Sequence, residues 1–381
     1  MRRIVLGVIA SCALVSWLGG CAKPAASSPA IAEVPAQSFI RQWSVDLSSE
    51  RKAKVVALHS AGEYVFAITD DRLSYVIRKD TGSLIAVHPI GGRGDISPPF
   101  TNGKLFAYPV STTIELFNLE GKAVRTVDLK SVVRSTGVFS AEMVFVGVTA
   151  ENGGRIRGID PGRAHDTPKW EVMTFGALLA APTYFDQAAF FATESGRVYA
   201  VSDQGVGQWA LPGGFFQAGG ILADLASDDF ALYVASTDTR LMAVNRKSGR
   251  IIWQYFAGQP LYEKPVPTAD TVYIAVRNQG LVALPKTEGD FSRRPRWISR
   301  EATSLLAEDD KYAYVRLRGN SIGAIEKMGG AVAFRSAPTN FKFMITNPTQ
   351  NGLVLAATED GKVFGIRPVT KPGTVGEVMF K

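Results

Sequence analysis

The sequence has little cysteine and little histidine, with two and three residues respectively among 381. Cys12 and Cys21 both precede residue 22, so the rest of the chain has neither a disulfide nor a thiolate nucleophile. His59, His88 and His165 fall in separate repeats and have no spacing typical of a metal cluster. The sequence predicts no catalytic, cofactor-binding or metal-binding residues.

A strong net charge is also lacking. The formal net charge is +7, and loss of Arg2 and Arg3 with the first 20 residues would leave +5. The densest basic cluster is FSRRPRW, residues 291–297, and an isolated basic loop of this kind is usually solvated. The composition therefore predicts no nucleic-acid partner.

The N-terminus is typical of a bacterial secretion leader. Two arginines precede an apolar run from Ile4 to Leu18, which is too short to remain as a membrane span. The next residues, LGGC, resemble the bacterial lipobox, where cleavage leaves a diacylated cysteine at the new N-terminus. Residues 1–20 are expected to be a lipoprotein signal peptide and Cys21 the lipid attachment site. A plain secretory leader is the alternative.

The leader is followed by a stretch rich in Ala, Pro and Ser. Residues 21–37 have almost no large apolar side chains, so we expect a flexible tether. Residue 22 is Ala rather than the Asp that retains many lipoproteins in the inner membrane. The expected location is therefore the periplasmic face of the outer membrane, with the chain held by its lipid anchor.

An apolar position recurs every 40–43 residues through the rest of the chain. Each occurrence ends a short alternating segment, and in most repeats a glycine turn follows; this pattern indicates antiparallel hairpins. We call these positions anchors; they are Ile77, Phe117, Ile159, Val201, Val244, Leu284, Ile325 and Ile366. Eight such units predict an all-β fold, an eight-bladed β-propeller of four-stranded blades over residues 38–369, with a tail at 370–381.

Large aromatic residues recur in the same frame. Trp170, Trp209, Trp253 and Trp297 each follow a glycine turn, and Phe334 has the equivalent place in the seventh repeat. A ring repeated once per blade is expected to fill the wedge between neighbouring blades rather than to bind a cofactor.

The eighth repeat has no aromatic residue after its anchor. Trp43 stands 34 residues before the first anchor, close to the 35 and 31 residues that separate Trp209 and Trp253 from theirs. We therefore expect the N-terminal strand RQWSVDL to form the outer strand of the last blade. This arrangement would close the ring and leave no open sheet edge between the ends of the chain.

With its lipobox, tether and eight repeats, the chain resembles the propellers whose repeats are like those of pyrroloquinoline quinone enzymes. Within them it is similar to the BamB family of outer-membrane assembly lipoproteins. That resemblance implies a non-enzymatic lipoprotein that binds the periplasmic POTRA domains of a BamA-like protein and assists assembly of β-barrel proteins. The repeat is specific for the fold and weak for any one function.

Two other functions remain open. A pyrroloquinoline-quinone-dependent dehydrogenase shares the fold, but such enzymes commonly hold the quinone against a disulfide of adjacent cysteines, with calcium bound by carboxylate oxygens. Acids that could supply oxygen ligands are Asp224, Asp228, Asp229, Asp309 and Asp310, but sequences such as SDD and EDD more often mark solvated turns between strands. A periplasmic propeller that binds another protein or a glycan through its loops is the third possibility.

One connection between repeats is unusually long. Trp209 to Tyr233 spans 24 residues, against 20 from Trp253 to Tyr273. The extra length contains Phe215 and Phe216 between two pairs of glycines, which lets the loop stand away from the blades. Phe215, Phe216 and Leu222 are the predicted partner-binding residues; the alternative is that the phenylalanine rings fold back into a blade.

The family's own contact residues are not matched. Members carry a Leu-Arg-Gly segment before the blade with the fourth anchor, and closely spaced aspartates in the following loop, as elements that contact BamA. Here residues 175–185 contain no arginine, and residues 213–225 contain Asp224 alone. The resemblance therefore implies the kind of partner but carries over no contact residue.

Overall fold

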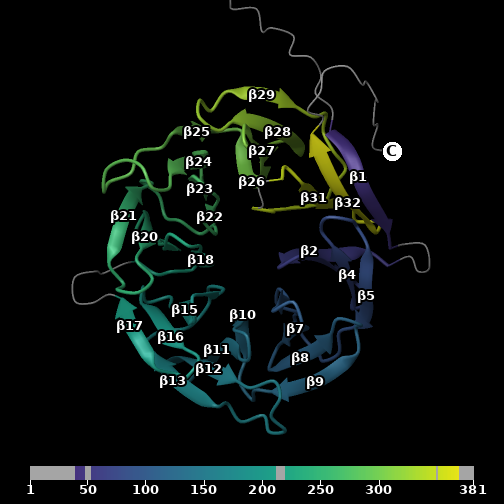
Figure 1. Cartoon of the computed structure of the whole chain (residues 1–381), viewed down its shortest axis with the longest axis vertical. Coiled ribbons are helices and arrows are strands. Elements are labelled where there is room, and N and C mark those ends of the chain that lie inside the picture. Colours follow the sequence, from purple (N-terminus) through teal and green to yellow (C-terminus); the bar gives the residue numbers. More distant parts are fainter. Residues whose placement is uncertain (1–38, 48–52, 212–218, 349–350, 369–381) are drawn as a thin grey trace, which may run out of the picture. The chain divides into compact units, whose positions relative to one another are not determined.

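The computed structural model describes residues 39–47, 53–211, 219–348 and 351–368. They lie in one compact unit, Pro35–Lys381. Every regular secondary-structure element of these described residues is a β-strand. These described residues include no helix of the length and apolarity that crossing a membrane requires. The strands form eight sheets of four antiparallel strands arranged as the blades of a propeller (Figure 1).

The first four blades follow one another along the chain. Blade 1 contains β2 (Val55–Ala61), β3 (Tyr64–Thr69), β4 (Leu73–Arg78) and β5 (Leu84–Pro89). Blade 2 contains β6 (Phe100–Thr101), β7 (Leu105–Val110), β8 (Thr113–Asn118) and β9 (Ala123–Asp128). Blade 3 contains β10 (Val133–Phe139), β11 (Val144–Ala150), β12 (Gly153–Ile159) and β13 (Trp170–Thr174). Blade 4 contains β14 (Thr183–Phe185), β15 (Ala188–Ala192), β16 (Val198–Ser202) and β17 (Gly207–Leu211).

The other four blades complete the ring. Blade 5 contains β18 (Ala226–Ser227), β19 (Leu232–Ala235), β20 (Arg240–Val244) and β21 (Ile251–Phe256). Blade 6 contains β22 (Val266–Pro267), β23 (Thr271–Val276), β24 (Gly280–Pro285) and β25 (Trp297–Ser299). Blade 7 contains β26 (Ala302–Glu308), β27 (Tyr312–Leu317), β28 (Ser321–Glu326) and β29 (Val332–Arg335). Blade 8 contains β30 (Phe343–Ile345), β31 (Val354–Ala357), β32 (Lys362–Pro368) and β1 (Phe39–Asp46).

The anchor positions lie near the ends of the third strands and are all buried. In blades 1, 2, 4, 5 and 7 the register with the fourth strand shifts at the anchor, as at Val244, where a β-bulge begins the turn. A bulge strengthens the local twist, so the recurring turn also aims the fourth strand. The sequence period therefore records a repeated backbone feature as well as a buried side chain.

The tryptophans join neighbouring blades, as the sequence predicted. In each described case the indole N–H donates to a backbone carbonyl in the turn before the fourth strand of the next blade, at 2.8–2.9 Å. The pairs are Trp43 with Lys79, Trp170 with Asp203, Trp253 with Lys286, and Trp297 with Lys327. The Trp209 side chain lies outside the described residues.

Small residues make room for these rings. Trp43 lies across from Gly365 in the register of its own blade and beside Gly82 of blade 1. A Cβ atom on Gly82 would come within 2.6 Å of the Trp43 ring, and Gly82 has a φ of +73°. Glycine is therefore required at this turn both for its backbone conformation and for the approach of the ring.

The expectation of one large aromatic residue per blade is wrong for blades 1 and 2. There Ala86 and Arg125 occupy the register position that tryptophan has elsewhere. Beside Ala86, the space is filled by His88, whose ring stacks on Phe117 with centroids 4.0 Å apart. Arg125 instead reaches Asp166 of blade 3. Different side chains thus fill the same inter-blade wedge.

The ring is closed by the N-terminal strand, as predicted. β1 pairs antiparallel with β32, from Phe39 opposite Pro368 to Asp46 opposite Lys362, so strands from both ends of the chain share blade 8 (Figure 1). Phe39 packs against Phe334 of blade 7, with ring centroids 5.6 Å apart. β1 therefore contacts both neighbouring blades, because Trp43 on the same strand reaches blade 1.

His59 and His88 lie in one blade, which corrects the expectation that they fall in separate repeats. They stand on β2 and β5, the inner and outer edge strands of blade 1 (Figure 1). Both belong to one blade because a blade ends after its fourth strand and not at its anchor. Both ring nitrogens of His88 are buried without a hydrogen-bond partner among the described residues. Burial lowers the pKa of His88 from 6.5 to about 4.

This burial predicts an acid-sensitive contribution to stability. Because the folded pKa of His88 is below its unfolded value, the unfolded chain gains the proton first as pH falls through 6.5 towards 4. The free energy of unfolding should drop over this window by up to about 3 kcal/mol. Urea unfolding at several pH values measures it. His88→Phe keeps the stacked ring, and its free energy of unfolding should fall by about 3 kcal/mol less between pH 6.5 and 4. An equal fall in the variant and the unaltered chain would contradict the prediction.

Candidate partner-binding site

Two connections between blades flank the turn between β15 and β16 in blade 4. Glu194 N donates to Ala177 O in the connection from β13 to β14, at 3.0 Å. Ile221 N, in the connection from β17 to β18, donates to Thr193 O at 3.2 Å. Backbone hydrogen bonds therefore hold the described parts of both connections against one turn.

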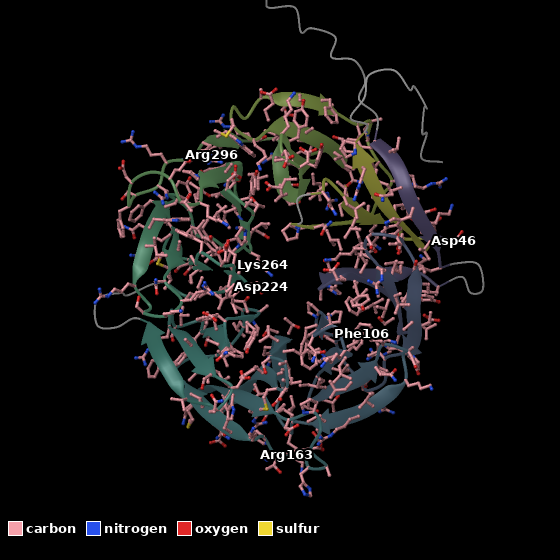
Figure 2. The ribbon with its side chains drawn as sticks, viewed as in Figure 1. Asp46, Phe106, Arg163, Asp224, Lys264 and Arg296 are labelled. Carbon is pink, nitrogen blue, oxygen red and sulfur yellow. The ribbon has the colours of Figure 1, made fainter. Side chains whose placement is uncertain are left out.

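Asp224 ties the two connections to each other. Its carboxylate accepts the backbone N–H of Ala181 at 2.8 Å, and Leu225 N donates to Ala181 O at 3.0 Å. The residue is labelled in Figure 2 towards the inner side of the ring. The single aspartate that the sequence showed in this loop thus has a structural partner in the neighbouring loop.

Exposed apolar side chains stand on these connections. Phe175 is 63% exposed, Leu179 37% and Leu222 39%, whereas the intervening Leu178 and Ile221 are buried. The buried members fix the connections to the blades, and the exposed members remain in contact with solvent. We call Phe175, Leu179 and Leu222 the apolar patch.

An arginine accompanies the patch. The Arg197 guanidinium lies over the Phe175 ring, 4.3 Å from its centroid, and comes from the turn between β15 and β16. Tyr199 Oη accepts the Phe175 N–H at 2.8 Å, and Ser195 Oγ donates to Phe175 O at 2.6 Å. Phe175 is therefore held in place while its ring remains mostly exposed. A cation–π pair at such a site combines apolar area with positive charge.

The sequence identified this region but only part of its residues. Leu222 lies in the apolar patch, while Phe215, Phe216 and Cys21 fall outside the described residues. Sequence reasoning missed Phe175, Leu179 and Arg197. The signal that could have found Phe175 and Leu179 is the presence of large apolar side chains in a connection between two repeats. Arg197 belongs to a later turn of blade 4, and the sequence gives no sign that this turn lies beside Phe175.

The acidic residues considered as metal ligands serve the turns of the blades. Asp228 accepts the backbone N–H groups of Phe230 and Ala231, and its carboxylate also binds Lys286 Nζ at 3.0 Å. Asp309 binds the N–H groups of Lys311 and Tyr312 in the same way. Both residues lie in turns between strands, as the sequence predicted, and their carboxylates also cap those turns. Among the described residues no group of three or more His, Cys, Asp or Glu is placed to hold a metal ion.

A cavity of about 530 Å³ lies along the first strands of several blades. Its walls include hydroxyl groups from four of them, and Lys264, labelled in Figure 2, lines it as well. The hydroxyl-bearing residues on these strands are Ser60, Thr183, Ser227, Thr303 and Ser304, and Thr346 directly follows β30. Such walls can donate and accept hydrogen bonds, and Lys79, Asp228 and Glu263 also line the cavity.

Comparison with known proteins supports the fold and the type of repeat. The family described as outer membrane protein assembly factor BamB matches residues 194–305, less than a third of the chain. Among solved structures, BamB from Moraxella catarrhalis is similar, with a TM-score of 0.66, 17% identity, and coverage of 88% of this chain and all of that one. A search of curated proteins found no match.

Two further solved structures are similar too. The computationally designed protein Ika8 has a TM-score of 0.57 and 14% identity, over 84% of this chain and 97% of the other. Saccharomyces cerevisiae Sqt1 has a TM-score of 0.63 and 10% identity, over 88% of this chain and 100% of the other. At these identities the structural likeness concerns the fold alone.

Proposed function

We propose that this chain, a BamB-like β-propeller of PQQ-type repeats, is a non-catalytic scaffold lipoprotein at the periplasmic face of the outer membrane. Its apolar patch binds the periplasmic POTRA domains of a BamA-like protein, and through this contact it assists the insertion of β-barrel proteins. The observation that carries the proposal is the apolar patch, held open on ordered connections beside Arg197.

The energetics of the apolar patch favour protein binding. Fully burying a phenylalanine or leucine side chain is worth about 1.5–3 kcal/mol, so three exposed residues provide a sizeable driving force for association. Phe175 is already fixed by hydrogen bonds to its backbone, and binding would order little else there. Aromatic residues and arginine are also the types enriched at binding hot spots.

The tryptophans and the acidic residues support the non-catalytic part of the proposal. The four described tryptophans are engaged in contacts between blades, and Asp228 and Asp309 are engaged in their own turns. These are the residue types that a quinone site with calcium would use. Their contacts give these residues structural roles, which supports the proposal of a scaffold.

Replacing Phe175 and Leu222 together with serine should remove the partner while the propeller remains folded. Both side chains are exposed, so the melting temperature should change by no more than a few degrees. Removing two anchors from the interface should weaken binding at least tenfold, because hot-spot residues typically contribute 2 kcal/mol or more. Co-purification from detergent-solubilised outer membranes, with the melting temperature measured in parallel, tests this.

Val206→Ser is the matched control. Val206 is also 63% exposed, but it stands on the turn between β16 and β17, at the opposite end of blade 4. This variant should retain the partner. Partner retention by the Phe175/Leu222 double variant, or equal loss with Val206→Ser, would argue against the apolar patch as the interface.

The lipid anchor predicts a separate result. Cys21→Ser removes the proposed acylation site, so the protein should move from the membrane fraction to the soluble periplasmic fraction. Fractionation followed by immunoblotting measures the distribution. Membrane attachment at the level of the unaltered chain would contradict the lipid anchor without affecting the apolar patch.

A further inference from the structure

A groove of about 420 Å³ lies between blades 6 and 7 and has arginines on its walls. Arg277 comes from the turn between β23 and β24, Arg316 from β27, and Arg318 from the turn between β27 and β28. Tyr262, in the connection from β21 to β22, forms another wall. The volume is within the range of ordinary ligand sites.

These arginines have no carboxylate partner among the described residues. Neither Arg277 nor Arg318 forms an ion pair with any described residue, and Arg316 binds the amide oxygen of Asn320 at 2.8 Å. Elsewhere on the surface, arginines close to acids do pair, as Arg335 does with Glu301 at 3.1 Å. The positive charge of Arg277 and Arg318 is therefore not neutralised by an ion pair with any described residue.

Part of the groove is held in position before any ligand binds. Asn320, which accepts from Arg316, donates its own amide hydrogens to the carbonyls of Thr339 and Phe341 at 2.9 and 2.8 Å. The Arg277 guanidinium lies over the Tyr262 ring, 5.6 Å from its centroid. Hydrogen bonds and ring packing restrict these side chains, which lowers the entropy that binding must overcome.

The walls beside the arginines are those of a site for a peptide. Pro260, Ala275, Val276 and Ala302 provide apolar surface, and Thr303 and Ser304 provide hydroxyls. Glu263 is the single acid on the wall, so three arginines leave the lining with a net positive charge. A groove of mixed apolar and hydroxyl walls fits an extended chain, while the planar guanidinium groups match carboxylates in a bidentate manner.

We propose that this groove binds an extended peptide segment that carries Asp or Glu side chains. Arg277 and Arg318 take the carboxylates, Arg316 stays fixed by Asn320, and the peptide backbone lies against the apolar and hydroxyl walls. The groove is separate from the apolar patch and consists of other residues, so this inference does not depend on the proposed function. The attraction is electrostatic, and the affinity should fall as salt is raised.

A labelled peptide that alternates Glu with Ala tests the site by fluorescence polarisation with the purified full chain. The unaltered protein should bind it, and the same peptide with Gln in place of Glu should bind at least tenfold more weakly. Arg277→Gln combined with Arg318→Gln should also weaken binding of the Glu peptide at least tenfold. Both side chains are exposed, so the melting temperature should be unchanged.

Two further variants keep the test decisive. Arg250→Gln removes an exposed arginine from the turn between β20 and β21 of blade 5, outside the groove. This variant should leave binding unchanged. Arg277→Lys with Arg318→Lys keeps the charge but removes the planar forks, so binding should be intermediate even if the glutamine variant is unstable.

Equal binding of the Glu and Gln peptides would overturn the proposal. So would an affinity for the Glu peptide that is the same in the unaltered chain, the double glutamine variant and the double lysine variant. Inorganic phosphate and vesicles containing an anionic phospholipid are added as competitors. If either displaces the Glu peptide at a lower concentration than unlabelled Glu peptide does, the groove is an anion or lipid-headgroup site and the peptide assignment is wrong. Competition by unlabelled Glu peptide alone supports the assignment.

Discussion

A chain that lacks residues 1–46 should fail to form a stable propeller. The deletion removes β1, so β32 loses its antiparallel partner and blade 8 loses its fourth strand. It also removes Phe39 and Trp43, which are 4% and 8% exposed and pack against blades 7 and 1. Losing each large aromatic residue costs about 3–5 kcal/mol, and the total approaches the 5–15 kcal/mol that stabilises a typical domain.

Calorimetry and urea unfolding would measure this effect. The chain without β1 should melt far below the full chain or show no cooperative transition. A chain that begins at residue 38, just before β1, is the control and should melt as the full chain does. If both shortened chains melt at the same temperature, the N-terminal strand does not close the ring.

Trp253→Ala should be the most damaging single substitution among the four tryptophans whose side chains the structure describes. Trp253 is fully buried, its ring lies 6.2 Å from that of Tyr233, and its N–H donates to Lys286 O of the next blade at 2.8 Å. The substitution leaves a cavity and removes the 2.8 Å hydrogen bond to the Lys286 carbonyl, which keeps only a 3.5 Å contact from Arg293. A loss of about 3–5 kcal/mol in the free energy of unfolding is expected.

Trp253→Phe separates the two causes. It retains most of the buried ring but loses the N–H donor, so the expected loss is about 1–2 kcal/mol. Urea unfolding followed by circular dichroism gives both values. An alanine variant within about 1 kcal/mol of the unaltered chain would contradict the role of the tryptophan between blades.

The fold could be predicted because the same local physics is repeated eight times. Buried anchors such as Val244, glycine turns such as Gly82 and rings such as Trp43 recur at nearly constant spacing, and each is fixed by contacts within a blade or with the next one. The absence of tryptophan after Ile366 even located the closing strand. Blades 1 and 2 depart from the pattern because Ala86 and Arg125 stand where tryptophan stands elsewhere. His88 fills the space beside Ala86, and Arg125 itself reaches blade 3.

The candidate site was less predictable because exposure is decided by neighbouring loops. Leu222 and Ile221 are adjacent and similar in the sequence, yet one is exposed and the other buried. Arg197 reaches Phe175 only because a turn of blade 4 lies beside the connection from blade 3. The arginine groove likewise combines turns of two blades, whose side-chain directions no repeat pattern specifies.

Photo-cross-linking in the native cells tests the central claim most directly. A benzophenone amino acid placed at Leu222 probes the apolar patch, and one placed at Val206 probes the opposite end of blade 4. The account predicts a light-dependent adduct with the BamA-like barrel-assembly protein from position 222 and none from position 206. No adduct with that protein at position 222, or equal adducts from both positions, would contradict the proposal that this face binds it.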